Sequence, residues 1–121
     1  MSTDIRWLAK PEEQDYPAAR SYLSLMYDEQ TAAQFVEKLR SVPLASFKAK
    51  DIFRASGLSL LGVSNKHVEK DQKKIRDGKE LSPLLLVRDK ARTTVIVADG
   101  YHRLCAVYSF DEDAEIPCKI V

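Results

Sequence analysis

The sequence predicts a small α+β domain, with a helical first half packed against a small sheet that is built in the second half. Two observations lead to this prediction. Up to Gly57, apolar residues recur at every third or fourth position, which is typical of amphipathic helices. From Pro83 onward they form short continuous runs instead, which are typical of strands covered on both faces. A length of 121 residues is that of one domain with one core, so we expect a single unit with a helical layer over residues 1–60 and a core over residues 62–121.

Two packed helices are predicted at the start of the chain. Pro17 suits the first position of a helix, with Asp15 upstream as the N-cap. Apolar residues then follow at helical spacing: Leu23, Met26 and Tyr27. Asp28 is a second N-cap, and the helix after it ends before Pro43. Its apolar stripe comprises Ala32, Phe35, Val36 and Leu39.

The middle of the chain is predicted to be less regular. Residues 45–50 are expected to form a linker. A short third helix is predicted from Asp51 as its N-cap to Gly57 as its C-terminal glycine. The apolar run from Leu58 to Val63 fits a short strand and a buried connector equally well.

The second half alternates helices and strands. Ser64-Asn65 is expected to cap an exposed helix that ends at Asp77-Gly78. The later elements are expected as a strand at Pro83–Val87, a turn at Asp89–Arg92, a strand at Val95–Ala98, a helix at Leu104–Phe110 and a strand at Ile116–Val121.

The junction between the last two strands is the most informative part of the sequence. The run Asp99-Gly100-Tyr101-His102-Arg103 joins a strand to the start of a helix. The first N–H groups of a helix lack intrahelical acceptors and lie at the positive end of its dipole, so they stabilise a phosphate or carboxylate. Arg103 can add donors and His102 can add a proton, while Asp99 fits either an N-cap or a carboxylate aimed at a metal or hydroxyl. The same five residues also fit a plain cap and turn without a ligand.

Composition restricts the partners that we expect. A net charge of +1 with interleaved signs argues against a dedicated nucleic-acid binder. The sequence has no apolar run long enough to span a membrane and no signal-peptide pattern, so we expect a cytoplasmic protein. Cys105 and Cys118 are too few for a zinc site and are expected to be reduced core thiols. The aromatic residues of the first half are expected in the core or at a homodimer contact.

The segment from Gly62 to Val121 resembles the superfamily of the ParB N-terminal domain and sulfiredoxin. Three stretches carry the likeness: the capped helix and turn at Ser64–Pro83, the strand at Leu84–Arg88, and Val97–Ala106 with its Asp-Gly-Tyr-His-Arg phrase. The likeness implies a small mixed sheet and a nucleotide, ATP or CTP, bound by its phosphates, with Mg²⁺ presumed. It implies phosphate binding by the turn residues Gly100, Tyr101, His102 and Arg103. It implies further ligand contacts from the capped helix, at Ser64, Asn65, Lys66 and His67.

Departures from the family pattern narrow the expected activity. Sulfiredoxins need a cysteine where Tyr101 stands, which argues against sulfinic-acid reduction. The sequence ends at Val121 without a helix-turn-helix region, so no module is seen for site-specific DNA binding. Asp99 alone near the turn argues against a nuclease.

The phrase Asp99 to Arg103 is similar to the signature of the free-serine kinases of this fold and differs from it only at Tyr101. Asp99 would then act as the catalytic base or as a metal contact. The resulting hypothesis is a nucleotide-binding domain acting as a small-molecule kinase or nucleotide hydrolase. The alternative is a non-catalytic module, either a nucleotide-responsive switch or a protein associated with nucleic acid. Arg103→Ala is expected to cost about 1.5 to 3 kcal/mol of ligand affinity with little loss of stability.

Overall fold

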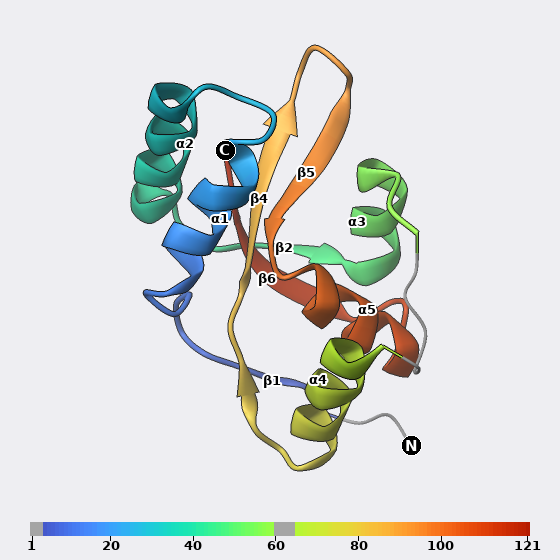
Figure 1. Ribbon diagram of the computed structural model, residues 1–121. Coiled ribbons are helices and arrows are strands. Elements are labelled where there is room, and N and C mark those ends of the chain that lie inside the picture. The colour runs from blue at the N-terminus through green and yellow to red at the C-terminus, as the bar shows by residue number, and fades with distance from the viewer. Residues whose placement is uncertain (1–3, 60–64) are drawn as a thin grey trace.

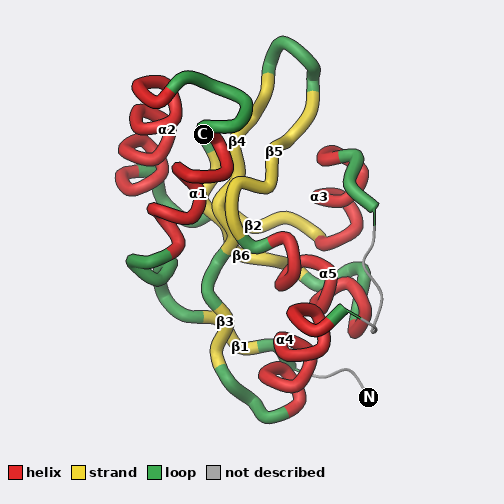
Figure 2. The backbone as a smooth tube through the Cα atoms, viewed as in Figure 1, coloured by secondary structure: helices red, strands yellow, loops and turns green. Residues whose placement is uncertain are grey.

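The computed structural model describes residues 4–59 and 65–121, and within them it shows a mixed α+β fold with five helices, a four-stranded sheet and a two-stranded sheet (Figures 1 and 2). This confirms the predicted fold class. The elements in chain order are β1 (Arg6–Trp7), α1 (Asp15–Leu23), α2 (Glu29–Ser41), β2 (Ala45–Lys48), α3 (Ala49–Ser56), α4 (Lys66–Arg76), β3 (Glu80–Leu81), β4 (Leu84–Asp89), β5 (Thr94–Asp99), α5 (Tyr101–Phe110) and β6 (Glu115–Ile120).

The larger sheet is mixed, with the strand order β2-β6-β4-β5. β4 pairs antiparallel with β5 and parallel with β6, because α5 carries the chain back across the sheet between β5 and β6. β2 pairs antiparallel with β6, so that Ala45 lies opposite Cys118. The first half of the chain therefore contributes an edge strand to the sheet.

Strand β4 is covered on both faces, as its continuous apolar run predicts. Alternate side chains of a strand point to opposite faces of its sheet. Leu85 and Val87 pack with α1 and α2, whereas Leu84 and Leu86 pack with α3, α4 and α5 (Figure 1). All four side chains are buried, so the sheet separates two apolar clusters.

Several predicted helix boundaries are confirmed. The Asp28 side chain caps α2 by accepting from the Thr31 N–H at 2.7 Å. Gly57 ends α3 in the left-handed conformation, with a φ of +68°. Asn65 caps α4 by accepting from the N–H groups of His67 and Val68. The expected strand at residues 95–98 and the final strand also lie where the apolar runs place them.

Two predicted caps and one helix end are wrong. Asp15 lies inside α1 with its carboxylate buried, and the cap position is held by Gln14 without a side-chain hydrogen bond. Asp51 lies in the first turn of α3, which begins after Lys48. α1 ends at Leu23, before the predicted Met26 and Tyr27. Asp15 and Asp51 match the residue type of an N-cap but lie within the first turn of their helices. Met26 and Tyr27 match the helical spacing of apolar residues but lie after the end of α1.

The predicted linker at 45–50 is also wrong, because β2 and the start of α3 occupy it. The segment Ala-Ser-Phe-Lys alternates over only four residues and holds a single large apolar residue, Phe47, so its pattern is weak. Its backbone pairing with β6 makes it a strand. The parallel pair β1 and β3, which joins residues 6–7 to 80–81, was not predicted either. The helical layer expected over residues 1–60 thus also contains strands. Most of the ambiguous run at Leu58–Val63 lies outside the described residues.

Candidate functional site

The strand-to-helix junction predicted at Asp99 to Arg103 is present in the structure. β5 ends at Asp99, and α5 starts at Tyr101 after Gly100, which has a φ of +106° and occupies the N-cap position. A side chain at this position would place its Cβ 2.8 Å from Leu84 Cγ and 2.9 Å from Arg103 Nη2. Gly100, and not Asp99, is therefore the cap residue. Within residues 4–59 and 65–121 no side-chain hydrogen bond caps the first N–H groups of α5.

Arg103 is held by carboxylates of its own chain. Its Nη2 donates to Asp99 Oδ2 at 3.0 Å and lies 3.6 Å from Asp15 Oδ2. Asp15 also accepts a hydrogen bond from the Ser82 hydroxyl. Only 17% of the Arg103 side chain and 7% of the Asp15 side chain are exposed. This cluster connects α5 to β5, α1 and the segment before β4, so Arg103 has a structural role. The expectation from the sequence that replacing Arg103 would cost little stability does not fit these contacts.

The environment of Asp99 alters its acidity. Burial raises the pKa of the Asp99 carboxyl, and the adjacent Arg103 guanidinium opposes this shift. The neighbouring Asp15 carboxyl adds to the increase in the Asp99 pKa, because two nearby carboxylates resist being charged together. Asp99 is consequently a stronger base than an ordinary aspartate, although one of its oxygens is engaged by Arg103.

A polar pocket of about 210 Å³ lies between α4 and the start of α5. Its lining comprises His67, Lys70, Asp71, Lys74, Asp99, Gly100, Tyr101, His102 and Arg103. The rings of His67 and His102 meet here with their centroids 4.8 Å apart. The Tyr101 hydroxyl, in contrast, donates to the carbonyl of Ser59.

The titratable groups of the pocket shift one another's pKa values. Burial lowers the pKa of His102 below its ordinary value of 6.5, and His67 and Arg103 lower it further while Asp71 raises it. Burial raises the pKa of Asp71, against the influence of Arg103, Lys74 and His102. At neutral pH, His102 is therefore neutral, and Arg103 and Lys74 remain the cations that act most strongly on Asp71.

The structure brings together most of the predicted site residues. Residues 99–103 line the pocket together with His67. Asn65 and Lys66 do not line it: Asn65 uses its side-chain oxygen to cap α4, and Lys66 is exposed. The remaining candidate, Ser64, lies outside the described residues.

The sequence reasoning missed three pocket residues on α4, namely Lys70, Asp71 and Lys74. They follow His67 at three, four and seven positions, which is the spacing of one helix face. This spacing could have identified the three residues from the sequence, because it places them on the same helix face as His67. Asp15 was assigned to a cap, and nothing in the local sequence indicated its contact with Arg103.

The two cysteines are buried, as predicted. Burial raises the pKa of the Cys118 thiol to about 11, which keeps it protonated and unreactive at neutral pH. Cys105 lies against Tyr101 one helical turn away. Among the residues that the structure describes, no group of three or more His, Cys, Asp or Glu side chains is arranged to hold a metal ion.

None of the helices in the described part of the chain is both long enough and apolar enough to cross a bilayer. Comparison of the chain with protein-family models, with curated proteins and with solved structures finds no match. The likeness to the ParB and sulfiredoxin superfamily therefore stays a prediction from the sequence.

Proposed function

We propose that the pocket between α4 and α5 binds the phosphate groups of a nucleotide, ATP or CTP. The observation that carries this proposal is that the start of α5 shares a pocket with a basic face of α4. Lys70 and Lys74 line that pocket together with Gly100 and His102. Backbone N–H groups at a helix start and lysine ammonium groups are the donors that proteins use to bind phosphate.

The volume of the pocket indicates which part of the nucleotide it would hold. At about 210 Å³ it suits phosphate groups rather than a whole nucleotide. A second hollow of about 460 Å³ adjoins it, shares residues 99–102, and is lined in addition by Tyr22 and Leu58. The exposed Tyr22 ring offers a face on which a base can stack.

The pocket also contains a carboxylate that fits Mg²⁺ bound to the phosphate groups of the nucleotide. Proteins usually bind Mg²⁺ through one or two carboxylates and the phosphate oxygens of the ligand. Asp71 lines the pocket and can supply such a carboxylate. When bound, the ion would shield the phosphate charge.

Two versions of the proposal differ in the role of Asp99. In the phosphotransferase version, Asp99 accepts the proton of the acceptor hydroxyl, a task that its raised pKa favours. In the non-catalytic version, the site only senses the nucleotide. The hydrogen bond that Asp99 accepts from Arg103 favours the second version, because it occupies one oxygen of the carboxylate that would have to accept the proton.

Calorimetric titration with ATP and CTP, with and without Mg²⁺, tests binding. Replacing both Lys70 and Lys74 with Met should weaken binding at least tenfold, since each contributes a charged contact. A matched variant with Met at Lys79 and Lys90, which are exposed and outside the pocket, should bind normally. If neither nucleotide binds the wild type at millimolar concentration, or if both double variants lose affinity equally, the proposal is wrong.

Phosphate transfer from ATP to small hydroxy amino acids tests the catalytic version. If Asp99 is the base, Asp99→Asn should abolish transfer while calorimetric binding is retained. Asp71→Asn serves as the comparison, because it should weaken Mg²⁺-dependent binding instead. Binding without any transfer by the wild type would select the non-catalytic version.

A further inference from the structure

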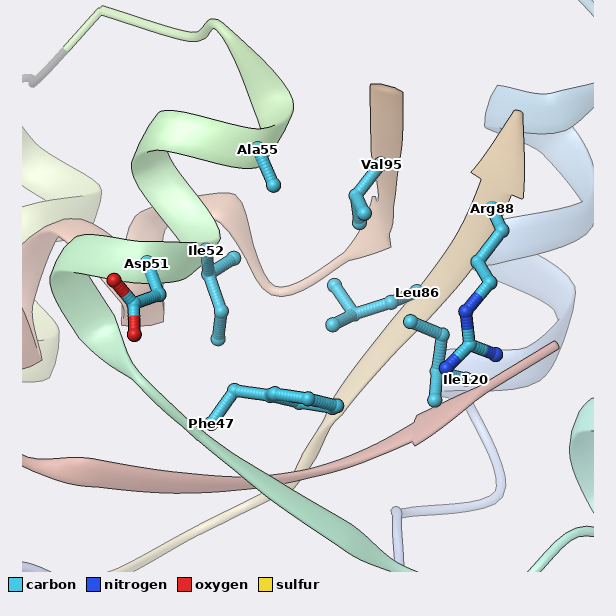
Figure 3. Close-up of a pocket in the computed structure, with 8 residues that line it drawn as sticks. All are labelled: Phe47, Asp51, Ile52, Ala55, Leu86, Arg88, Val95 and Ile120. Carbon is cyan, nitrogen blue, oxygen red and sulfur yellow. The ribbon is translucent and has the colours of Figure 1, made fainter. Parts of the chain in front are cut away.

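Another pocket lies between α3 and the larger sheet, on the face of α3 that points toward the sheet (Figure 3). Its volume is about 220 Å³. Its lining comprises Phe47, Asp51, Ile52, Ala55, Leu86, Arg88, Val95 and Ile120, from α3 and all four strands of the larger sheet. It shares no residue with the phosphate pocket, so it would be a separate site.

The walls of this pocket are almost entirely apolar. Leu86 and Ile52 are 1% and 3% exposed, so they are held firmly by the core. Phe47 is 37% exposed, and Figure 3 shows its ring across one side of the opening. Because an open apolar hollow leaves carbon surface in contact with water, an apolar group that fills it is stabilised by about 25 cal/mol for each Å² that both surfaces bury.

Two charged residues flank the apolar walls on opposite sides (Figure 3). The Arg88 side chain lies at the Ile120 side of the pocket and is exposed, and among residues 4–59 and 65–121 it forms no ion pair. Its backbone is fixed, since its N–H donates to the Val121 carbonyl at 2.7 Å. Asp51, on the other side, is already 3.9 Å from Arg54. Arg88 is therefore available to pair with an anion, whereas the Asp51 carboxylate already has a cationic neighbour in Arg54.

We propose that this pocket binds a small monocarboxylic acid with an aromatic or branched apolar body. The body would rest on Leu86 and Ile52, and the carboxylate would pair with Arg88. The size is appropriate, because an apolar cavity of about 150 Å³ accommodates benzene, and this pocket is somewhat larger. A guanidinium binds a carboxylate through two parallel hydrogen bonds, which sets the orientation of such a ligand.

The probe for this site is 3-phenylpropionate, compared with its neutral isostere 3-phenylpropanamide. Titration of ¹⁵N-labelled protein, followed by amide chemical shifts, should show saturable changes at Ile52, Leu86 and Val95. The acid should bind about threefold or more tightly than the amide, because only the acid forms a charged pair with the exposed Arg88 guanidinium. Equal binding of the two probes, or changes confined to the α4–α5 pocket, would overturn the proposal.

Two variants make the test specific. Arg88→Met keeps an apolar stem and removes the charge, so it should reduce the affinity of the acid to that of the amide; Arg76→Met on α4 is the matched control and should change nothing. Ala55→Leu should fill the pocket from a helix position that accepts leucine and should block both probes. Unchanged binding of the acid by either pocket variant, with the fold confirmed by circular dichroism, would also refute it.

Discussion

Replacing Arg103 with Met should destabilise the fold, because Arg103 pairs with two poorly exposed carboxylates. The change leaves Asp15 and Asp99 facing each other without their guanidinium. Removing one member of a buried ion pair costs about 3 to 5 kcal/mol, and the 17% exposure of Arg103 places the expected value near the lower end, at about 3 kcal/mol. With an unfolding entropy of about 2.1 cal/mol/K per residue over 121 residues, this corresponds to a fall in Tm of about 12 °C.

Thermal and urea unfolding followed by circular dichroism would measure this effect at pH 7 and at pH 4. Without Arg103, the pKa of Asp99 should rise further, so the folded state binds a proton more tightly than the unfolded state. Stability lost at neutral pH is therefore recovered as the pH falls through the raised pKa. Arg54→Met, which removes an ion pair to Asp51 on the surface, is the control and should leave Tm nearly unchanged. A fall in Tm of less than about 4 °C at pH 7, or one that does not shrink at pH 4, would refute the structural role of Arg103.

Four further outcomes are expected. Asn65→Ala should cost about 1 kcal/mol in urea unfolding by removing the α4 cap, whereas Asn65→Asp, which keeps the acceptor, should cost less. Gly100→Ala should cost about 3 kcal/mol from its positive φ and the clash with Leu84, and Gly78→Ala, with open space around it, only about 1 kcal/mol; equal costs would contradict the close approach. Because the folded-state pKa of His102 is lowered, wild-type stability should fall from pH 7.5 to 5.5 more than that of His102→Gln. Cys118 should resist alkylation at pH 8 in native protein and react once urea unfolds it; rapid native labelling would show that it is accessible.

The sequence predicts those parts of the fold whose signal is local and strong. The unbroken apolar run of β4 indicates a strand with two covered faces, and the structure confirms it. The caps at Asp28 and Asn65 combine a suitable side chain with an apolar stripe directly after it. In β2 the order Ala-Ser-Phe-Lys has no such pattern, and only pairing with β6 makes it a strand.

In the candidate site, too, the local features could be predicted from the sequence and the long-range contacts could not. The turn at Gly100 and its neighbours is a continuous stretch, so its shape follows from local rules. The pairing of Arg103 with Asp15 joins residues far apart in the chain, and no local rule connects them. Asp15 at a helix start matches the pattern of a cap, and only its burial in the folded chain distinguishes the two roles.

The inner position of β6 determines when the sheet can be completed. Because β6 lies between β2 and β4, both remain without a partner on that side until residues 115–120 have been synthesised. An incomplete nascent chain therefore exposes two open strand edges, one of them the strongly apolar β4. Exposed edges of this kind pair readily with other chains, so premature termination should give aggregation rather than a smaller folded protein.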